Sequence, residues 1–522
     1  MNHCESKYFL TIDNGTQSVR ALVFDRQGQL LAKSKINIEP YVEPQAGWAE
    51  QDPQYYWDSL CKACQQVLQQ LNAPKESIAA VSVTTQRTTA IVLDVKGEAL
   101  YPAITWLDRR KVDTKPALGF VENMMMRLLR VKPSVDDFHA QSEVNWLAQN
   151  KPEVWQQVHK YLMLSGYHNF RLTGQYKDAV ASQVGYLPFD FKKLGWAKAN
   201  DWKWRAIPTL RPDMLPELVK AGEVLGYITT EASRDTGIPV GVPVIASGSD
   251  KACEVLGSGC IETGIGSLSY GTTATLNIAG DKYLEPVPHH PAYPGIIPQT
   301  YNTEVMVNRG YWMVTWYKEE FGLQERLLAK EKNTTPETLL DDLLRSTPPG
   351  SLGLVLQPYW GAGTSAKDPS ARGAMIGFGE MHTRAHIYRS IIEGLTFALR
   401  EGKELLEKRS GNLIDVLRIS GGGSQSNEVM QISANIFGMN VQRPHTFETS
   451  GLGAAIACAV ATNVYPDFKM AVSQMVHSGD VFKPNPEHQK VYDRLYKEVY
   501  SGMYGSLQTG YQKIQKITGY PS

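Results

Sequence analysis

Two short polar turns in this chain carry residue types that could bind the phosphate groups of a nucleotide. The first turn follows an apolar run at residues 8–10 and an isolated carboxylate at Asp13, and it consists of Gly15, Thr16, Gln17 and Ser18. A carboxylate can hold a cation, while backbone N–H groups and hydroxyls can hold phosphate oxygens. Asn14-Gly15 is also a strong hairpin signal, so an ordinary hairpin with a polar turn explains this stretch equally well.

A second copy of the pattern lies in the other half of the chain. A strand is expected over Ser267–Tyr270, the turn Gly271-Thr272-Thr273 follows, and alternating apolar residues resume over 274–278. Two hairpins with the same turn chemistry indicate a duplicated domain whose turns grip one phosphate chain from both sides. The sequence contains neither GxxxxGK[ST] nor GxGxxG, so neither of those phosphate loops is present.

Other polar side chains are expected where buried strands end. β-Branched runs on both sides of residues 84–88 put Gln86 and Arg87 at strand ends, where a sheet can present them to a ligand. Trp106 follows the next apolar run and precedes Asp108, Arg109 and Arg110. The alternative for the aspartate and the two arginines is a local salt bridge that holds a loop.

A carboxylate between a strand and a helix is the best candidate for a general base. Residues 241–249 indicate a buried strand that runs into a Gly-Ser turn, Asp250 follows, and a helix is expected from Lys251. At a strand end beside a helix N-terminus this carboxylate is poised to stay ionised and to accept a proton. Capping the helix is the commoner role for such an aspartate.

A run of three glycines favours a flat ligand close to the backbone. Gly421, Gly422 and Gly423 separate a short strand at 417–420 from a helix that ends at Phe437. Glycines leave no Cβ in the way of adenine and ribose, although a tight strand–helix turn would itself use one or two of them. Residues 358–372 are rich in glycine and serine, and we expect them to form a mobile loop over the site.

Length and composition set the frame for these candidates. With 522 residues the chain is too long for one core, and we expect two domains, 1–262 and 263–522, the first with a mainly helical insertion at 114–235. Equal numbers of basic and acidic residues, 53 of each, argue against a nucleic-acid surface. The longest apolar segment, Leu452–Ala461, is too short for a membrane span, and the N-terminus lacks a signal-peptide pattern, so we expect a cytoplasmic protein.

The cysteines indicate core packing rather than a metal or redox site. Six cysteines in a chain of this length do not form a disulfide framework. Cys61 and Cys64 form a CxxC, but they share one helical face with Trp57, Leu60 and Val67, and no second ligand pair is in view.

The order of the motifs resembles the FGGY family of carbohydrate kinases over essentially the whole chain. The motifs are DNGTQS at 13–18, GWAEQDP at 47–53, WLDRR at 106–110, the strand-end Asp250, YGTT at 270–273, the segment 368–395 and GGGSQSN at 421–427. The resemblance implies an α/β fold of two duplicated ribonuclease-H-like domains, as in actin and hexokinase, around a central cleft. It also implies ATP and Mg²⁺ as cofactors.

The resemblance assigns roles to individual residues. Asp250 would be the catalytic base for the sugar hydroxyl, and Asp13 together with Asp250 would hold the metal. The ATP-binding residues would be Thr16, Gln17, Ser18 and Arg20 in the first half, and Gly271, Thr272, Gly422, Gly423, Ser426 and Asn427 in the second. Phosphoryl transfer requires this combination of positioning, charge neutralisation and a proton acceptor. The first domain would thus bind the sugar and the second ATP.

The substrate pocket departs from the patterns of known subfamilies. The expected substrate-binding residues are Gln86, Arg87, Trp106, Phe138 and Lys251. They resemble those of glycerol kinases, but Thr88 and Phe138 stand where those enzymes carry Glu and Tyr, and Lys251 stands where they carry Gln. Xylulokinases tend to have Met-His at positions 87 and 88. The resemblance therefore implies an ATP-dependent kinase for a hydroxyl of a ketose or polyol, xylulose-, ribulose- or glycerol-like.

The alternative function is an actin- or chaperone-like ATPase without sugar phosphotransfer. It would share the phosphate turns, but it has no use for polar groups such as Gln86, Arg87 and Trp106. The expected partner is a small-molecule sugar or polyol, with no nucleic acid and no membrane, and a homodimer is compatible with the sequence.

Overall fold

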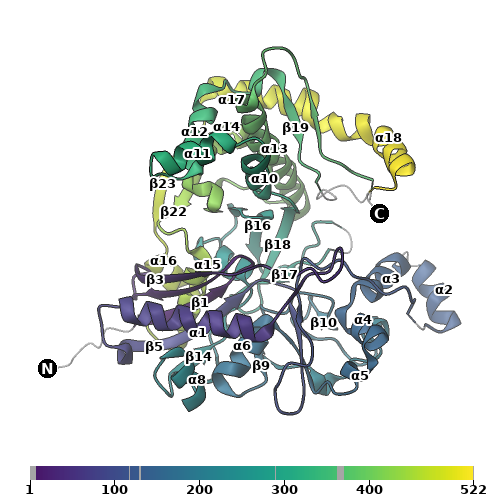
Figure 1. Cartoon of the computed structure of the whole chain (residues 1–522), viewed down its shortest axis with the longest axis vertical. Coiled ribbons are helices and arrows are strands. Elements are labelled where there is room, and N and C mark those ends of the chain that lie inside the picture. Colours follow the sequence, from purple (N-terminus) through teal and green to yellow (C-terminus); the bar gives the residue numbers. More distant parts are fainter. Residues whose placement is uncertain (1–7, 117, 129–130, 288–289, 361–369, 521–522) are drawn as a thin grey trace.

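The computed structural model of the chain describes residues 8–116, 118–128, 131–287, 290–360 and 370–520. Figure 1 shows two lobes, with most of the first half of the chain in one and most of the second half in the other. Most of the predicted loop at 358–372 lies outside the described residues. None of the described helices combines the length and the apolar character that crossing a membrane requires.

The first lobe is built on a six-stranded sheet with the order β13-β14-β5-β1-β2-β3. The strands are β1 (Tyr8–Asn14), β2 (Ser18–Phe24), β3 (Leu30–Asn37), β5 (Ile78–Thr85), β13 (Val224–Tyr227) and β14 (Pro243–Ile245). β1, β2 and β3 form an antiparallel meander, while β5 runs parallel to β1 and β14 parallel to β5. The carboxyl ends of β1, β5 and β14 therefore meet at one edge of the sheet.

The second lobe repeats this arrangement in a seven-stranded sheet with the order β17-β18-β16-β15-β21-β22-β23. The strands are β15 (Ile265–Tyr270), β16 (Ala274–Gly280), β17 (Tyr293–Pro294), β18 (Tyr301–Val307), β21 (Val416–Gly421), β22 (Val441–Pro444) and β23 (Ser478–Phe482). β18-β16-β15 is antiparallel, and β21 and β22 continue it in parallel, as β3-β2-β1-β5-β14 do in the first lobe. The predicted duplicated ribonuclease-H-like fold is confirmed.

Amphipathic helices cover both sheets. Helix α1 (Pro53–Gln70) starts at Asp52, whose side chain accepts the N–H of Gln54, and it packs on β2 and β3. Cys61 and Cys64 are buried on its apolar face, so the prediction of core cysteines is confirmed. The remaining second-lobe elements are α10 (Trp312–Glu320), α11 (Leu323–Glu331), α12 (Pro336–Ser346), β19 (Val355–Gln357), β20 (Ala374–Ile376), α13 (Arg384–Ser410), α14 (Asn427–Phe437), α17 (Pro486–Arg494) and α18 (Ser501–Thr518).

One helix of the second half of the chain packs on the first lobe. Helix α15 (Thr449–Ala461) lies against β1, β5 and α9 (Asp250–Gly257), and α16 (Phe468–Met475) lies beside it (Figure 1). A Cβ at Gly453 would lie 1.9 Å from the carbonyl oxygen of Cys253, so only glycine permits this approach. The small residues of this helix therefore serve close packing, and the boundary between 262 and 263 stays a prediction.

The insertion at 114–235 is mainly helical only in its first part, and the later part mixes short strands with two short helices. The first part contains α2 (Phe120–Leu128), α3 (Lys132–Gln141), α4 (Glu143–Asn150), α5 (Pro152–Trp155) and α6 (Leu164–Thr173). Between α5 and α6, β8 (Lys160–Met163) joins a small sheet with β4 (Glu50–Gln51), β6 (Ala90–Leu93) and β7 (Ala103–Ile104). The later part contains β9 (Lys177–Ala179), β10 (Phe189–Asp190), β11 (Gly195–Trp196), α7 (Trp202–Ala206), β12 (Glu217–Val219) and α8 (Thr230–Thr236).

The prediction of a mainly helical insertion is therefore wrong after residue 173. The strands there are two to four residues long. Alternation between apolar and polar residues needs a longer stretch to be recognised, so such strands leave almost no periodic signal.

Candidate active site

Three of the predicted residues lie at the edge where the parallel strands of the first sheet end. Asp13 is the penultimate residue of β1, Arg87 follows β5 by two residues, and Asp250 begins α9 after β14. The N–H of Gln86 donates to the carbonyl of Asn14 at 2.9 Å, which ties the two strand ends together. Parallel pairing thus brings together groups that are far apart in the sequence.

Asp13 is buried and has one oxygen to spare. Only 1 % of the residue is exposed, and its Oδ2 accepts from Arg20 at 2.6 Å. Its Oδ1 is buried without a hydrogen-bond partner among the described residues. Burial raises the pKa of Asp13 to about 6, against the opposing charge of Arg20, and the nearby charge of Asp250 raises it further. An unpartnered buried carboxylate oxygen is a fitting ligand for a divalent cation.

Arg20 is engaged by two carboxylates. Besides Asp13 it binds Glu448 at 2.6 Å, and Glu448 also pairs with Lys33. Glu448 immediately precedes α15, so this ion pair joins the two halves of the chain. Sequence reasoning missed Glu448, because nothing local marks an acidic residue whose partners lie more than 400 positions away.

The first turn is shorter than expected. The loop consists of Gly15, Thr16 and Gln17, while Ser18 already belongs to β2 and is buried. The indole N–H of Trp106 donates to the hydroxyl of Thr16 at 3.0 Å. Trp106 thus lies beside the loop, whereas the side chain of Gln17 is exposed.

Asp250 is not the helix cap. The hydroxyl of Ser249 caps α9 by accepting the N–H of Ala252, so the capping alternative for Asp250 is wrong. The Asp250 carboxylate stands in the first turn, where the helix dipole favours negative charge. Burial raises its pKa, while the charges of Lys251 and Arg87 oppose that rise. A carboxylate with a raised pKa and nearby cations can accept a proton.

Arg87 reaches across to the second lobe. Its guanidinium binds Glu304 of β18 at 2.9 Å and lies 4.9 Å from the ring centroid of Tyr293. Neither partner was predicted from the sequence. Glu304 is an acidic residue within the strand at 301–307, and a charge at such a position indicates a buried partner. Thr88 adopts a left-handed backbone with φ 53°, which is uncommon for a β-branched residue and typical of functional sites.

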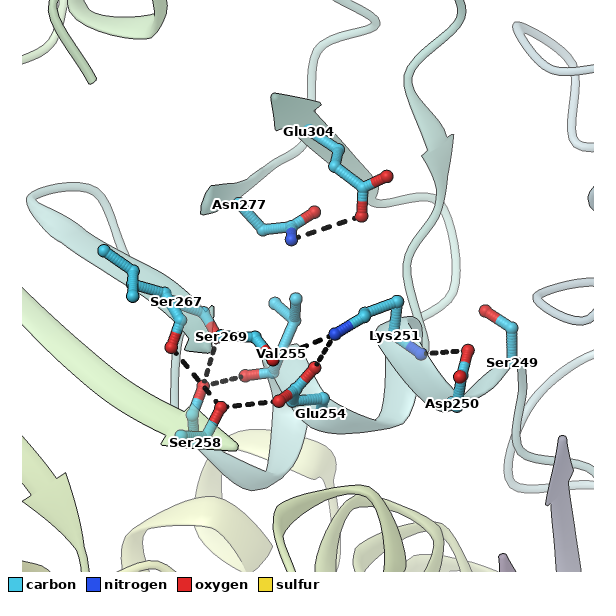
Figure 2. Close-up of polar contacts among 12 residues, drawn as sticks. Ser249, Asp250, Lys251, Glu254, Val255, Ser258, Ser267, Ser269, Asn277 and Glu304 are labelled. Carbon is cyan, nitrogen blue, oxygen red and sulfur yellow. Dashed lines mark hydrogen bonds and ion pairs between the residues drawn. The ribbon is translucent and has the colours of Figure 1, made fainter. Parts of the chain in front are cut away.

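Lys251 forms a second bridge between the lobes (Figure 2). Its ammonium donates to Glu254 at 2.7 Å and to the hydroxyl of Ser269 on β15 at 2.9 Å. The other oxygen of Glu254 accepts from Ser420 on β21 at 2.5 Å. The contacts of Glu254 were not predicted, because the residues of α9 do not indicate which strand ends this helix faces.

The second turn and the glycine run lie side by side. β15 pairs with β21 so that Tyr270 faces Gly421, and the residues that follow both strands share one edge. A Cβ at Gly421 or Gly423 would lie within 2.8 Å of Tyr270 atoms, so these two glycines are needed for packing. A Cβ at Gly422 would lie 3.9 Å from its nearest neighbouring atom. Of the three glycines, only Gly422 therefore has open space beside it.

Ser426 and Asn427 are held at the start of α14. The hydroxyl of Ser426 accepts the N–H of Val429 as the helix cap and donates to Asp341 at 2.6 Å. The side-chain oxygen of Asn427 accepts from Arg443 at 2.7 Å. Both side chains therefore lie at the end of the glycine run.

Two predicted or considered groups lie apart from this cluster. Phe138 of α3 packs edge-on against Tyr186 and Trp202, 5.5 and 5.2 Å between ring centroids, and no contact joins it to the strand ends within the described residues. Arg110 binds Asp108 and Glu50, and its guanidinium lies over the rings of both Trp48 and Trp146. The local salt-bridge interpretation is therefore correct for Arg110.

The described residues contain no group of three His, Cys, Asp or Glu side chains arranged to hold a metal ion. Mg²⁺ is commonly held by one or two carboxylates together with substrate phosphates and water, so Asp13 with its free oxygen fits this cation.

Comparison with known proteins gives a consistent result. Sequence models of the FGGY family of carbohydrate kinases match residues 8–257 with the N-terminal domain and residues 266–462 with the C-terminal domain. An uncharacterized sugar kinase of Escherichia coli K12 is 30 % identical over 499 residues, 95 % of this chain and 93 % of the relative. A xylulose kinase of Lactococcus lactis is 28 % identical over 500 residues, 94 % of this chain and 96 % of the relative.

A solved structure has the same fold. The ligand-bound xylulose kinase from Lactobacillus acidophilus superimposes with a TM-score of 0.80 at 23 % identity, over 97 % of this chain and 100 % of that one.

Proposed function

The chain belongs to the FGGY family of carbohydrate kinases and is an ATP-dependent sugar phosphotransferase, and from this premise we propose that its substrate is a ketose or polyol. The family membership sets aside the alternative of an actin- or chaperone-like ATPase without sugar phosphotransfer.

One observation carries the assignment of the site. Asp13, Arg87 and Asp250 converge at one edge of the first sheet, and Lys251 of α9 reaches Ser269, two residues before the second turn. The charge of Asp250 raises the pKa of both Asp13 and Arg87, which supports a single shared site.

In the proposed reaction, Asp250 takes the proton of the substrate hydroxyl as its oxygen attacks the γ-phosphorus of ATP. The new O–P bond forms, the bond from phosphorus to the β,γ-bridging oxygen breaks, and its electron pair stays on ADP. A positioned general base contributes roughly 10²- to 10⁴-fold to such a step. Asp250 itself needs no further activation, because its pKa is already raised by burial.

The phosphate-side residues have proposed roles as well. The loop at Gly15–Gln17 with Ser18 and Arg20 would contact the phosphates from the first lobe, and Gly271 and Thr272 from the second. Gly422, Gly423, Ser426 and Asn427 would line the adenosine pocket. Mg²⁺, which Asp13 and Asp250 would hold, supplies charge neutralisation on the transferring phosphates.

The sugar side is defined by Gln86, Arg87 and Trp106. The side-chain oxygen Oε1 of Gln86 is buried without a hydrogen-bond partner in the described part of the chain, so it can accept a hydrogen bond from a substrate hydroxyl. Thr88, which stands where glycerol kinases carry a glutamate, donates its hydroxyl to the Val184 carbonyl at 3.2 Å. With two hydroxyl acceptors fewer than a glycerol site, at Thr88 and Phe138, and with a xylulose kinase among the relatives, we place 2-ketoses ahead of glycerol.

We propose that Phe138 does not bind the sugar itself. It would instead help to form the wall of the sugar site through its ring contact with Tyr186. A cytoplasmic location and a homodimer also remain proposals, and light scattering on the purified protein tests the second.

A substrate panel tests the proposal. Purified enzyme with ATP and Mg²⁺ is assayed for ADP release against pentuloses, hexuloses, polyols, glycerol and gluconate, and the products are identified by mass spectrometry. We expect a ketose to give the highest kcat/KM, and Arg87→Met to raise the KM for that substrate about tenfold through loss of a charged hydrogen bond. Preference for gluconate, or ADP release without any phosphorylated product, would overturn the substrate assignment.

A further inference from the structure

The ammonium of Lys251 is anchored beneath the second phosphate turn. Figure 2 shows the side chain running along α9 toward β15, where it meets Glu254 and Ser269. Ser269 lies two residues before Gly271, and a Cβ placed on Gly271 would be 3.8 Å from Nζ. The charge therefore lies next to the turn rather than at the end of β5.

The anchor holds both strands of the second site. Glu254 accepts from Lys251 with one oxygen and from Ser420 with the other. Ser269 and Ser420 face each other on β15 and β21, and each directly precedes the last residue of its strand. The Lys251–Glu254 ion pair of α9 is thus hydrogen-bonded to β15, which leads into the phosphate turn, and to β21, which leads into the glycine run.

One donor of the ammonium is still available. An ammonium has three N–H groups. Two are used by Glu254 and Ser269, and no acceptor for the third lies among the described residues. Burial lowers the pKa of Lys251, but the charges of Glu254 and Asp250 outweigh this and hold the pKa above its ordinary value, so the group is charged at neutral pH.

We propose that Lys251 binds the γ-phosphoryl group of ATP, rather than the sugar, and stabilises it during transfer. This proposal rests on the proposed function. As the sugar oxygen bonds to phosphorus and the bond to ADP breaks, charge spreads over the equatorial phosphoryl oxygens, and a fixed cation beside Gly271 meets that charge. Lysine suits this role because it binds phosphate as a point charge. Asp250 would then act on the sugar hydroxyl and Lys251 on the γ-phosphoryl group, from adjacent positions of one helix.

Nucleotide binding tests the proposal without any sugar. Isothermal titration compares ADP with adenylyl imidodiphosphate, which keeps a γ-phosphoryl group, on wild type and Lys251→Met. We expect the affinity for the analogue to fall about tenfold and the affinity for ADP to change less than twofold. Equal losses for both nucleotides, or no loss, would overturn the proposal. Lys490→Met is the matched control, because Lys490 forms an exposed ion pair with Glu487 at the same three-residue spacing.

Kinetics separate this role from sugar binding. For Lys251→Met we expect kcat to fall roughly 10- to 100-fold with the sugar KM within twofold, and for Lys251→Arg partial recovery of kcat. A raised sugar KM with unchanged discrimination between the two nucleotides would instead identify Lys251 as a sugar ligand.

Two further measurements keep these outcomes distinct. If Lys251→Met fails to fold, as judged by thermal melting, Ser269→Ala removes one anchor and is expected to shift the same nucleotide discrimination about threefold. If wild type phosphorylates no member of the substrate panel, the proposed substrate fails, while the nucleotide titration still decides the role of Lys251.

Discussion

The two hairpin loops share a backbone design and differ in charge. Each has three residues that begin Gly-Thr, between an inner strand and its antiparallel neighbour. Asp13 and Ser269 occupy equivalent positions, two residues before the glycine. The cross-strand neighbour of Asp13 is Arg20, whereas that of Ser269 is Thr275.

This difference gives the two loops different chemistry. At the first loop a buried carboxylate keeps one oxygen free, which suits a cation. At the second loop a neutral hydroxyl accepts from the ammonium of Lys251, which suits phosphate. In the proposed roles, single residues at the strand ends would assign metal binding to the first of these two similar loops and anion binding to the second.

The largest effect should come from the base on the first side. Asp250→Asn removes the proton acceptor, and we expect kcat to fall about 10²- to 10⁴-fold while ADP affinity is retained. Initial rates with the preferred sugar and a parallel ADP titration check this. A variant with near-normal kcat would show that the first lobe does not supply the base.

The buried carboxylate should also affect stability in a pH-dependent way. The pKa of Asp13 is about 6 in the folded protein and near 3.8 unfolded, so the folded state binds the extra proton between these values. Stability contributed by this proton is full below about pH 4 and is lost as the pH rises through 6. Relative to Asp13→Asn, wild type should lose about 2 kcal/mol of unfolding free energy from pH 4 to pH 7.

Urea unfolding of both proteins in the presence of EDTA measures this difference. A constant gap between the two proteins over this range would contradict the assigned burial cost. Above pH 6 the free carboxylate should bind Mg²⁺ progressively better, since protons no longer compete.

Converting the first loop to the chemistry of the second sharpens the comparison. Asp13→Ser places a hydroxyl where Ser269 has one, and we expect kcat to fall about 30-fold, or about 2 kcal/mol, with a higher Mg²⁺ requirement. Rates over a Mg²⁺ titration test this. Asp58→Ser, on the exposed face of α1, is the matched control. An unchanged Mg²⁺ requirement would place the metal elsewhere.

The smallest effect concerns the support of the first loop. The Thr16 hydroxyl is bound by Trp106, whereas the hydroxyl of its counterpart Thr272 has no partner within the described residues. Trp106→Phe should cost about 1 kcal/mol and lower kcat/KM about fivefold. A loss below twofold would contradict both this support and the proposed place of Trp106 on the sugar side.

Local patterns predicted the loops well and their partners poorly. The two Gly-Thr turns, the helical face that holds Cys61 and Cys64, and the strand-end position of Asp250 follow from short-range periodicity and turn chemistry, and all are present. The helix was expected from Lys251 but begins at Asp250, because Ser249 and Asp250 are both good caps and only the fold selects between them. Three glycines at 421–423 suggested a ligand, yet two of them are required by Tyr270.

The repeated hairpins, the family-specific order of motifs and the acidic residues Asp13 and Asp250 at two strand ends follow from the sequence alone, since they depend on neighbours along the chain. Which charges meet depends on how separate segments of the chain pack against one another. Glu448 binds Arg20, Glu304 binds Arg87, and Ser269 binds Lys251, and each pair joins distant segments. The physical reason is that parallel strand pairing and the close contact of α9 with α15 set these distances, and neither leaves a local signal in the residues it brings together.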